Sequence, residues 1–108
     1  MNKDDCLVNQ IYNILEDKKA LDIKIMEVSD KTTLADYFII ASGTSNTHIK
    51  SLAQEIIYQL KKNGILPNSQ EGTQTASWIL LDYGQVIVHI FSEEMREFYN
   101  LEHFWGEQ

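Results

Sequence analysis

The feature that most constrains the fold of this chain is a predicted β-hairpin between residues 78 and 91. Two runs of apolar residues, 78–81 and 86–91, flank the tetrapeptide Asp82-Tyr83-Gly84-Gln85. Valine, isoleucine, tryptophan and phenylalanine favour a pleated, half-buried surface, and Asp-x-Gly favours a turn because glycine adopts a positive φ at little cost. The chain is therefore expected to build a sheet. The expected core positions of the hairpin, or else their alternates on the other face, are Ile79, Leu81, Val86 and Val88.

Two amphipathic helices are predicted outside the hairpin. The first covers residues 4–19, and the second begins after residue 43. In each of them apolar residues recur every three or four positions, which is the period of a helix with one buried face. Thr44 or Ser45 can cap the start of the second helix through its hydroxyl, and Gly64 suits its C-terminal end. The apolar stripes are Leu7, Ile11, Ile14 and Leu15 in the first helix, and Ile49, Leu52, Ala53, Ile56, Ile57 and Leu60 in the second.

Further strands are predicted on both sides of the second helix. Residues 22–28 alternate between apolar and polar, as in a strand with one wetter face, and residues 37–42 are apolar almost throughout, as in a central strand. The polar segment 68–76 has room for a short edge strand, and an acidic helix starts at Ser92. The resulting order, α-β-β-α-(β)-β-β-α, predicts an α+β or mixed α/β fold with a single mixed β-sheet of about five strands flanked by helices.

Size and charge limit the kind of partner. A chain of 108 residues with 44% apolar content suits one compact domain with a single core, spanning residues 1–108. It carries 16 Asp and Glu against 9 Lys and Arg, a formal net charge of −7. Such a chain has no general attraction to phosphate. We therefore expect a basic protein, and not bare nucleic acid, as its main contact.

The sequence predicts a cytoplasmic protein without a membrane segment. No apolar stretch reaches the roughly 20 residues that span a bilayer, and residues 1–5 are too acidic to begin a signal peptide. The single cysteine, Cys6, has no second cysteine with which to form an internal disulfide. We expect Cys6 to serve packing on the first helix.

The turn Gly43-Thr44-Ser45 is the strongest candidate for an enzymatic site. It stands between a buried strand and a helix start, where backbone N–H groups can hold an anion, and nucleotidyltransferases use a comparable Gly-Ser turn. Their chemistry also needs paired carboxylates, so that two Mg²⁺ ions sit roughly 4 Å apart. No Asp-x-Asp pair is present here, because Asp22, Asp36 and Asp82 stand on separate predicted elements. A capped helix start is the favoured interpretation, and a nucleotide-binding enzyme remains the alternative.

The three histidines do not form a pattern typical of catalysis or metal binding. His89 alternates with apolar neighbours in the hairpin, which favours a hydrogen-bonded, half-buried side chain. His48 falls in the first turn of the second helix, and His103 has no second ligand at a suitable spacing. The sequence therefore predicts no catalytic residue, no metal ligand and no cofactor.

The C-terminal segment combines aromatic and acidic residues. Its aromatic and acidic side chains lie so close in sequence that some rings are expected to face solvent, beside carboxylates that would complement a basic protein. The same helix could instead seal the sheet with its aromatics, and the two roles can belong to different faces. The residues are Phe98, Tyr99, Leu101, Phe104 and Trp105, with Glu93, Glu94, Glu97 and Glu102.

Four blocks of residues resemble the ribosomal silencing factor family, also called Iojap-related, in order and register. That resemblance implies a fold similar to that of nucleotidyltransferases without their catalytic residues, which agrees with the missing carboxylate pair. Gln85, where many relatives have an acid, and Thr47, where a basic residue is common, depart from the pattern. The matching blocks are residues 35–46, 71–72, 78–84 with 88–91, and 96–102 with Trp105.

The resemblance also implies a function. Members of this family are understood to bind the large ribosomal subunit through its fourteenth large-subunit protein and to block joining of the small subunit, which represses translation when nutrients are short. Carried onto this sequence, the motif suggests Trp78, Asp82 and Tyr83 as contacts, with an acidic rim of Glu97, Tyr99 and Glu102. A homodimer of the free protein, formed by its exposed aromatics, is a further possibility left open by the sequence.

Overall fold

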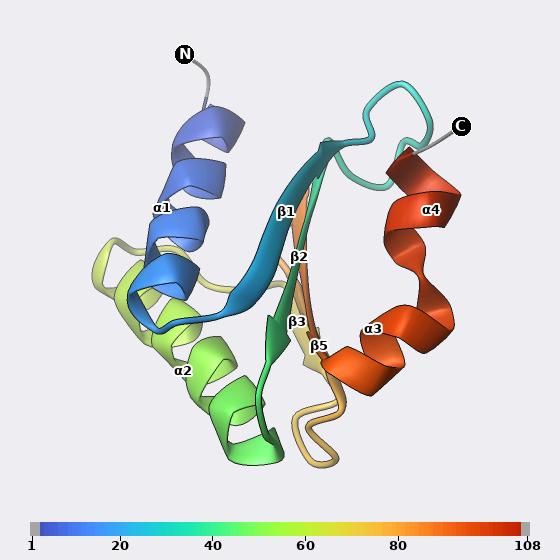
Figure 1. Cartoon of the computed structure of the whole chain (residues 1–108). Coiled ribbons are helices and arrows are strands. Elements are labelled where there is room, and N and C mark those ends of the chain that lie inside the picture. The colour runs from blue at the N-terminus through green and yellow to red at the C-terminus, as the bar shows by residue number, and fades with distance from the viewer. Residues whose placement is uncertain (1–2, 107–108) are drawn as a thin grey trace.

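The fold is a five-stranded mixed sheet with two helices on each face (Figure 1). The computed structural model describes residues 3–106, and the side chains of residues 6–103. The predicted α+β architecture is confirmed. In chain order the elements are α1 (Lys3–Asp17), β1 (Leu21–Glu27), β2 (Tyr37–Gly43), α2 (Asn46–Lys62), β3 (Ser69–Glu71), β4 (Trp78–Asp82), β5 (Val86–Ser92), α3 (Glu93–Tyr99) and α4 (Leu101–Gly106).

The strands lie in the order β1-β2-β5-β4-β3. Strand β5 pairs in parallel with β2 and antiparallel with β4, so it occupies the middle of the sheet. The predicted strand 37–42 is interior, as expected, although the middle position belongs to β5. The predicted short edge strand is β3, and the wetter strand β1 forms the opposite edge.

The hairpin predicted between residues 78 and 91 is confirmed as β4 and β5. Its register pairs Trp78 with Phe91 and Asp82 with Ile87, and the N–H of Tyr83 donates to the carbonyl of Val86 at 2.9 Å to close the turn. Side chains alternate between the two faces along each strand. Each strand of the hairpin therefore contributes to both layers of the core.

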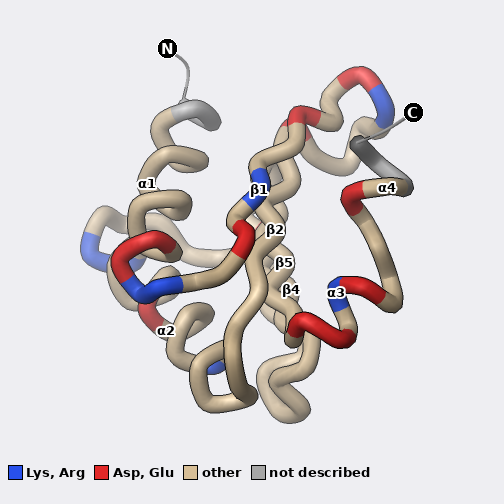
Figure 2. The backbone as a smooth tube through the Cα atoms, in the orientation of Figure 1, with Lys and Arg blue, Asp and Glu red and all other residues tan. Residues whose placement is uncertain are grey.

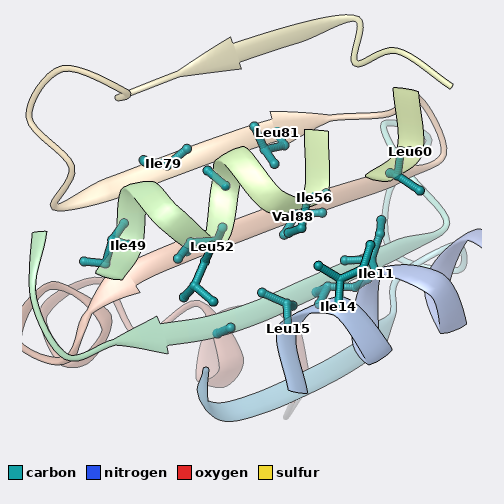
Figure 3. Close-up of a cluster of buried hydrophobic side chains, with 14 of the residues drawn as sticks. Ile11, Ile14, Leu15, Ile49, Leu52, Ile56, Leu60, Ile79, Leu81 and Val88 are labelled. Carbon is teal, nitrogen blue, oxygen red and sulfur yellow. The ribbon is translucent and has the colours of Figure 1, made fainter. Parts of the chain in front are cut away.

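The larger core layer lies between the sheet and helices α1 and α2 (Figure 3). The apolar stripes predicted on the two helices meet one face of β2, β4 and β5 there. All four predicted hairpin core residues are fully buried in this layer. Cys6 is exposed on α1, so the prediction that it packs was wrong. Residues in the layer include Ile11, Leu15, Ile49, Leu52, Ile56, Leu60, Ile79, Leu81, Val86 and Val88.

Both ends of α2 form as the sequence indicates. Of the two candidate caps, Ser45 is the one used, because its hydroxyl accepts a hydrogen bond from the N–H of His48 at 3.1 Å. After the cap residue Asn63, Gly64 adopts a left-handed conformation with φ of +78°. These caps set the length of the helix and thus which of its turns lies over the sheet.

Helices α3 and α4 cover the other face only in part. Their residues Met95 and Leu101 pack, together with Trp78 and Ile87, against a smaller buried cluster. A single short helix was predicted after Ser92, but Asn100 adopts a left-handed conformation and divides the segment into two helices. Predictions for the rings of Phe104 and Trp105 lie outside the described side chains. The buried cluster consists of Met26, Val28, Ala35, Phe38, Ile40 and Phe91.

Candidate functional site

Trp78 lies on the face of β4 that carries α3, and it is only half-buried. Its ring stacks on Phe91 with centroids 5.0 Å apart and touches Tyr99 at 4.5 Å. A pocket of about 170 Å³ opens beside it, lined by Glu71, Trp78 and Leu80. Trp78 is thus packed against rings on one side and borders a pocket on the other.

An exposed aromatic patch continues from Trp78 onto the end of α3. Tyr99 is 42% exposed and Phe98 is 76% exposed, and their ring centroids lie 5.1 Å apart. The prediction that some C-terminal rings face solvent is confirmed. Phe98 was not among the predicted contacts, because a helix of only seven residues has no periodic pattern that separates outward from inward rings. We refer to Trp78, Phe98 and Tyr99 as the aromatic patch.

Carboxylates accompany this patch on α3. Glu93, Glu94 and Glu97 are all exposed, and Figure 2 shows acidic residues, in red, along α3 and at the start of α4. Glu93 and Glu94 stand in the first turn, where their negative charge interacts favourably with the helix dipole and stabilises the helix. The helix that ends in the exposed rings of Phe98 and Tyr99 therefore carries several negative charges.

Glu102 lies close to Glu97 in sequence but is held inside the protein surface. Its carboxylate accepts a hydrogen bond from Nε of Arg96 at 2.7 Å, and both side chains are largely buried. Arg96 also donates to the Ser42 hydroxyl at 3.0 Å and to the Leu21 carbonyl at 3.4 Å. Arg96 therefore ties α3 and α4 to strands β1 and β2, a role for which the sequence has no local pattern.

The other two predicted contacts belong to the hairpin turn. The Asp82 carboxylate accepts the N–H of Gly84 at 2.8 Å, which stabilises the turn. Tyr83 packs against the larger core layer, on the opposite face of the sheet from Trp78. Its hydroxyl is buried without a hydrogen-bond partner among the described residues, and burial raises the pKa of Tyr83 to about 12. The structure thus brings Trp78 to Tyr99 but places Tyr83 apart from them.

His89 lies on β5, diagonally across the hairpin from Trp78, with ring centroids 6.0 Å apart. Its Nδ1 accepts a hydrogen bond from the indole Nε1–H of Trp78 at 3.2 Å, so the predicted hydrogen bond is present. The side chain is 5% exposed, which makes it more buried than predicted, because Phe38 and Phe91 enclose the imidazole ring. Burial lowers the pKa of His89 to about 4. Near neutral pH the ring is therefore uncharged and able to accept.

Acidification is expected to destabilise the protein through His89. An unfolded histidine has a pKa near 6.5, and burial lowers that of folded His89 to about 4. As the pH falls, the unfolded state therefore binds the proton first. The free energy of unfolding keeps its full value above about pH 6.5 and decreases by about 3 kcal/mol between about pH 6.5 and about pH 4. Urea unfolding at about pH 7 and about pH 4.5 measures the loss. His89→Leu should show a smaller loss than the natural chain, and equal losses would contradict the assignment.

Several polar groups of the Gly43-Thr44-Ser45 turn are hydrogen-bonded within the chain. The N–H of Thr44 donates to Nδ1 of His48 at 2.9 Å, and the N–H of His48 donates to the Ser45 hydroxyl. The Nε2–H of His48 donates to the Lys18 carbonyl at 2.9 Å, which joins the turn to the end of α1. Two N–H groups that an anion cradle would use are thus occupied.

Among the described residues, no three His, Cys, Asp or Glu side chains are grouped so that they could hold a metal ion. Within residues 3–106, no helix is both long and apolar enough to span a bilayer.

Comparisons with known proteins identify relatives along nearly the full length. The sequence model of a family described as "Ribosomal silencing factor during starvation" matches residues 2–108. The ribosomal silencing factor of Bacillus subtilis is 40% identical over 92 residues, which cover 85% of this chain and 78% of the relative. A Mus musculus protein named "Mitochondrial assembly of ribosomal large subunit protein 1" is 28% identical over 101 residues, or 91% of this chain and 44% of that protein.

The fold is shared as well. A crystal structure of a Chromobacterium violaceum protein superimposes with a TM-score of 0.93 at 33% identity, covering 100% of this chain and 89% of the other. The family resemblance noted in the four sequence blocks is confirmed by these matches. Because the family model and the most similar relatives extend over nearly all of it, this chain belongs to the ribosomal silencing factor family.

Proposed function

We propose that this protein binds the large ribosomal subunit through its fourteenth large-subunit protein and thereby blocks joining of the small subunit. Membership of the silencing family supports a role in repressing translation. The name of the mouse relative connects that protein with the large subunit. The observation that carries the docking proposal is the aromatic patch, which remains exposed next to the carboxylates of α3.

The patch has the properties of an interface hot spot. Tryptophan and tyrosine offer large, rigid contact areas, and a few such side chains supply most of the binding energy in protein complexes. Trp78 and Tyr99 are already in contact, so little side-chain ordering remains for the binding step. Glu93, Glu94 and Glu97 would attract a basic ribosomal protein and raise the association rate.

The proposed mechanism is steric and non-enzymatic, and it requires no cofactor. A protein seated on the face of the large subunit that meets the small subunit excludes that partner by volume alone. The occupied N–H groups at the Gly43-Thr44-Ser45 turn favour this role over that of a nucleotidyltransferase. We place the action in the cytoplasm during nutrient shortage, when repression of translation is useful.

Sedimentation with separated ribosomal subunits tests the proposal. The protein is expected to travel with large subunits and not with small ones, and its addition should reduce the fraction of joined ribosomes. Failure to travel with large subunits would overturn the proposal. Titration calorimetry with Mg²⁺ and a nucleoside triphosphate tests the enzyme alternative, for which binding heat would be required.

The exposed rings also favour weak self-association of the free protein. Phe98 is 76% exposed, and burial against a second copy would remove its apolar surface from water. Because dimer and ribosome complex would use the same patch, large subunits are expected to dissociate the dimer. Light scattering of the free protein measures the dimer, and purified large subunits serve as the competitor.

Replacing Glu97 by lysine is expected to slow association with large subunits at low salt. Glu97 is exposed on α3 beside the aromatic patch, so the change reverses a charge that attracts a basic partner without disturbing the core. Stopped-flow or surface-based kinetics at two salt concentrations measures the effect, which should shrink as salt rises. Asp17→Lys is the matched control, because it makes the same change of charge at an exposed position at the end of α1. Equal rates for both variants would remove Glu97 from the docking surface.

A further inference from the structure

We propose that His89 is a positioning residue, which holds the indole of Trp78 in the orientation that docking requires. The inference rests on the proposed function, because it assigns Trp78 to the contact with the ribosome. It adds a residue that does not itself reach the partner. The hydrogen bond between Trp78 Nε1 and His89 Nδ1, at 3.2 Å, is its basis.

Trp78 has one polar anchor and several apolar ones. Its ring stacks on Phe91 and lies tilted against Tyr99, and neither contact between rings is directional in the way that a hydrogen bond is. A hydrogen bond is directional and admits only orientations in which Nε1–H points at the acceptor. Since Trp78 is only half-buried, packing alone does not enclose it. The bond to His89 therefore selects one indole orientation.

The acceptor is rigid because the imidazole is enclosed. Phe38 contacts it edge-on at a centroid distance of 5.1 Å, and Phe91 lies nearly parallel to it at 6.1 Å. On the paired strand, Leu80 stands opposite His89, so Trp78 is the diagonal neighbour on the same face. The sheet register itself thus brings donor and acceptor together.

His89 also has a feature that packing does not require. Because Nδ1 accepts, the proton of the uncharged ring resides on Nε2, and that atom is buried without a hydrogen-bond partner among the described residues. A buried donor left without a partner destabilises the folded state. An apolar side chain would avoid this cost. The benefit that histidine provides at this position is an acceptor for Trp78.

Two variants of similar size separate positioning from packing. His89→Asn retains an acceptor near the place of Nδ1, whereas His89→Leu has none. Leu is expected to weaken binding to large subunits about three- to tenfold while its stability is unchanged or increased, because the buried Nε2–H is removed as well. Asn is expected to restore most of the affinity. His89→Gln, whose amide reaches toward the place of Nε2, should not restore it.

The indole N–H provides a readout independent of the ribosome. In ¹⁵N-labelled protein with Trp105→Phe, the remaining indole N–H signal belongs to Trp78. His89→Leu is expected to shift this signal and to speed its exchange with water, and His89→Asn to reverse both changes. Loss of the imidazole ring current can by itself shift the signal, so the exchange rate decides: a purely structural role for His89 would change stability and leave the exchange of the indole proton in the folded protein unchanged.

The outcomes of the test separate this inference from the proposed function. If Trp78→Ala weakens binding to large subunits and His89→Leu does not, the positioning role of His89 is wrong, and Trp78 remains part of the proposed docking site. If Trp78→Ala binds as tightly as the natural chain, the docking site is wrong, and the positioning role falls with it. Should His89→Leu fail to fold, the natural chain still decides, because NMR of its imidazole must show the proton on Nε2. A proton on Nδ1 would overturn the inference.

Discussion

Replacing Trp78 by alanine is expected to weaken binding to large ribosomal subunits by about thirtyfold or more, while the circular dichroism of the free protein remains that of a folded chain. The magnitude follows from the loss of a hot-spot side chain, worth about 2 kcal/mol or more. Trp78 is a partly buried neighbour of the smaller core cluster and is not among the residues of the larger core layer. Co-sedimentation with purified subunits measures the affinity.

The control for this prediction is Tyr58→Ala. Tyr58 is 57% exposed on α2, on the other side of the sheet, and its ring contacts the ammonium group of Lys62. Removing it deletes an exposed aromatic ring of comparable kind without touching the aromatic patch. Binding should then match that of the natural chain. If Trp78→Ala instead abolishes the folded spectrum, Trp78 belongs to the core and its assignment to docking is wrong.

Replacing Gly72 by alanine is expected to lower the free energy of unfolding by about 2–5 kcal/mol. Gly72 adopts φ of +80°, and a Cβ atom there would stand 1.9 Å from the carbonyl oxygen of Trp78. Backbone atoms cannot rotate out of the way as a flexible side chain would, so the start of β4 must move. Urea or thermal unfolding measures the loss, which is a large share of the about 5–15 kcal/mol that stabilises a domain.

Gly64 separates conformational strain from steric overlap. It has a similar φ of +78°, but nothing lies within 4 Å of a Cβ built on it. Gly64→Ala is therefore expected to cost only the left-handed conformation, about 1–2 kcal/mol. Equal losses in the two variants would show that the contact with Trp78 is relieved at little cost. A larger loss in Gly72→Ala would show that the added Cβ moves the backbone at Trp78, and binding to large subunits should then be weaker as well.

The local parts of the fold could be predicted from the sequence because they rest on local chemistry. The hairpin is specified by its turn residues and its alternating strands, and α2 by its stripe and its caps. The parallel pairing of β2 with β5 could not be predicted, since no short-range signal connects strands that are separated in the chain by α2, β3 and β4. The break at Asn100 was also missed, because a non-glycine residue in the left-handed region has only a weak sequence signal.

The candidate site was harder to predict than the fold. The side chain types were recognisable, but whether a ring faces the core or solvent depends on the helices above it. Tyr83 and Trp78 are five positions apart on one hairpin, yet they pack on opposite faces of the sheet. The Arg96–Glu102 pair depends on the left-handed turn at Asn100, which brings the first turn of α4 within reach of Arg96 on α3. The hydrogen bond between Trp78 and His89 could have been predicted from the sequence, because the register of the hairpin makes the two residues diagonal neighbours.

The central position of β5 in the sheet affects how the chain folds during its synthesis. During synthesis β1 and β2 can pair as they emerge, and so can β3 and β4, but the two pairs do not touch in the sheet until β5 inserts between them. Contacts of such long sequence separation form late. Among the strands of residues 3–106, β5 is therefore both the last to be synthesised and the one that completes the sheet, and α3 follows directly from it. A nascent chain cannot present the aromatic patch, so it should not occupy the ribosomes that are making it.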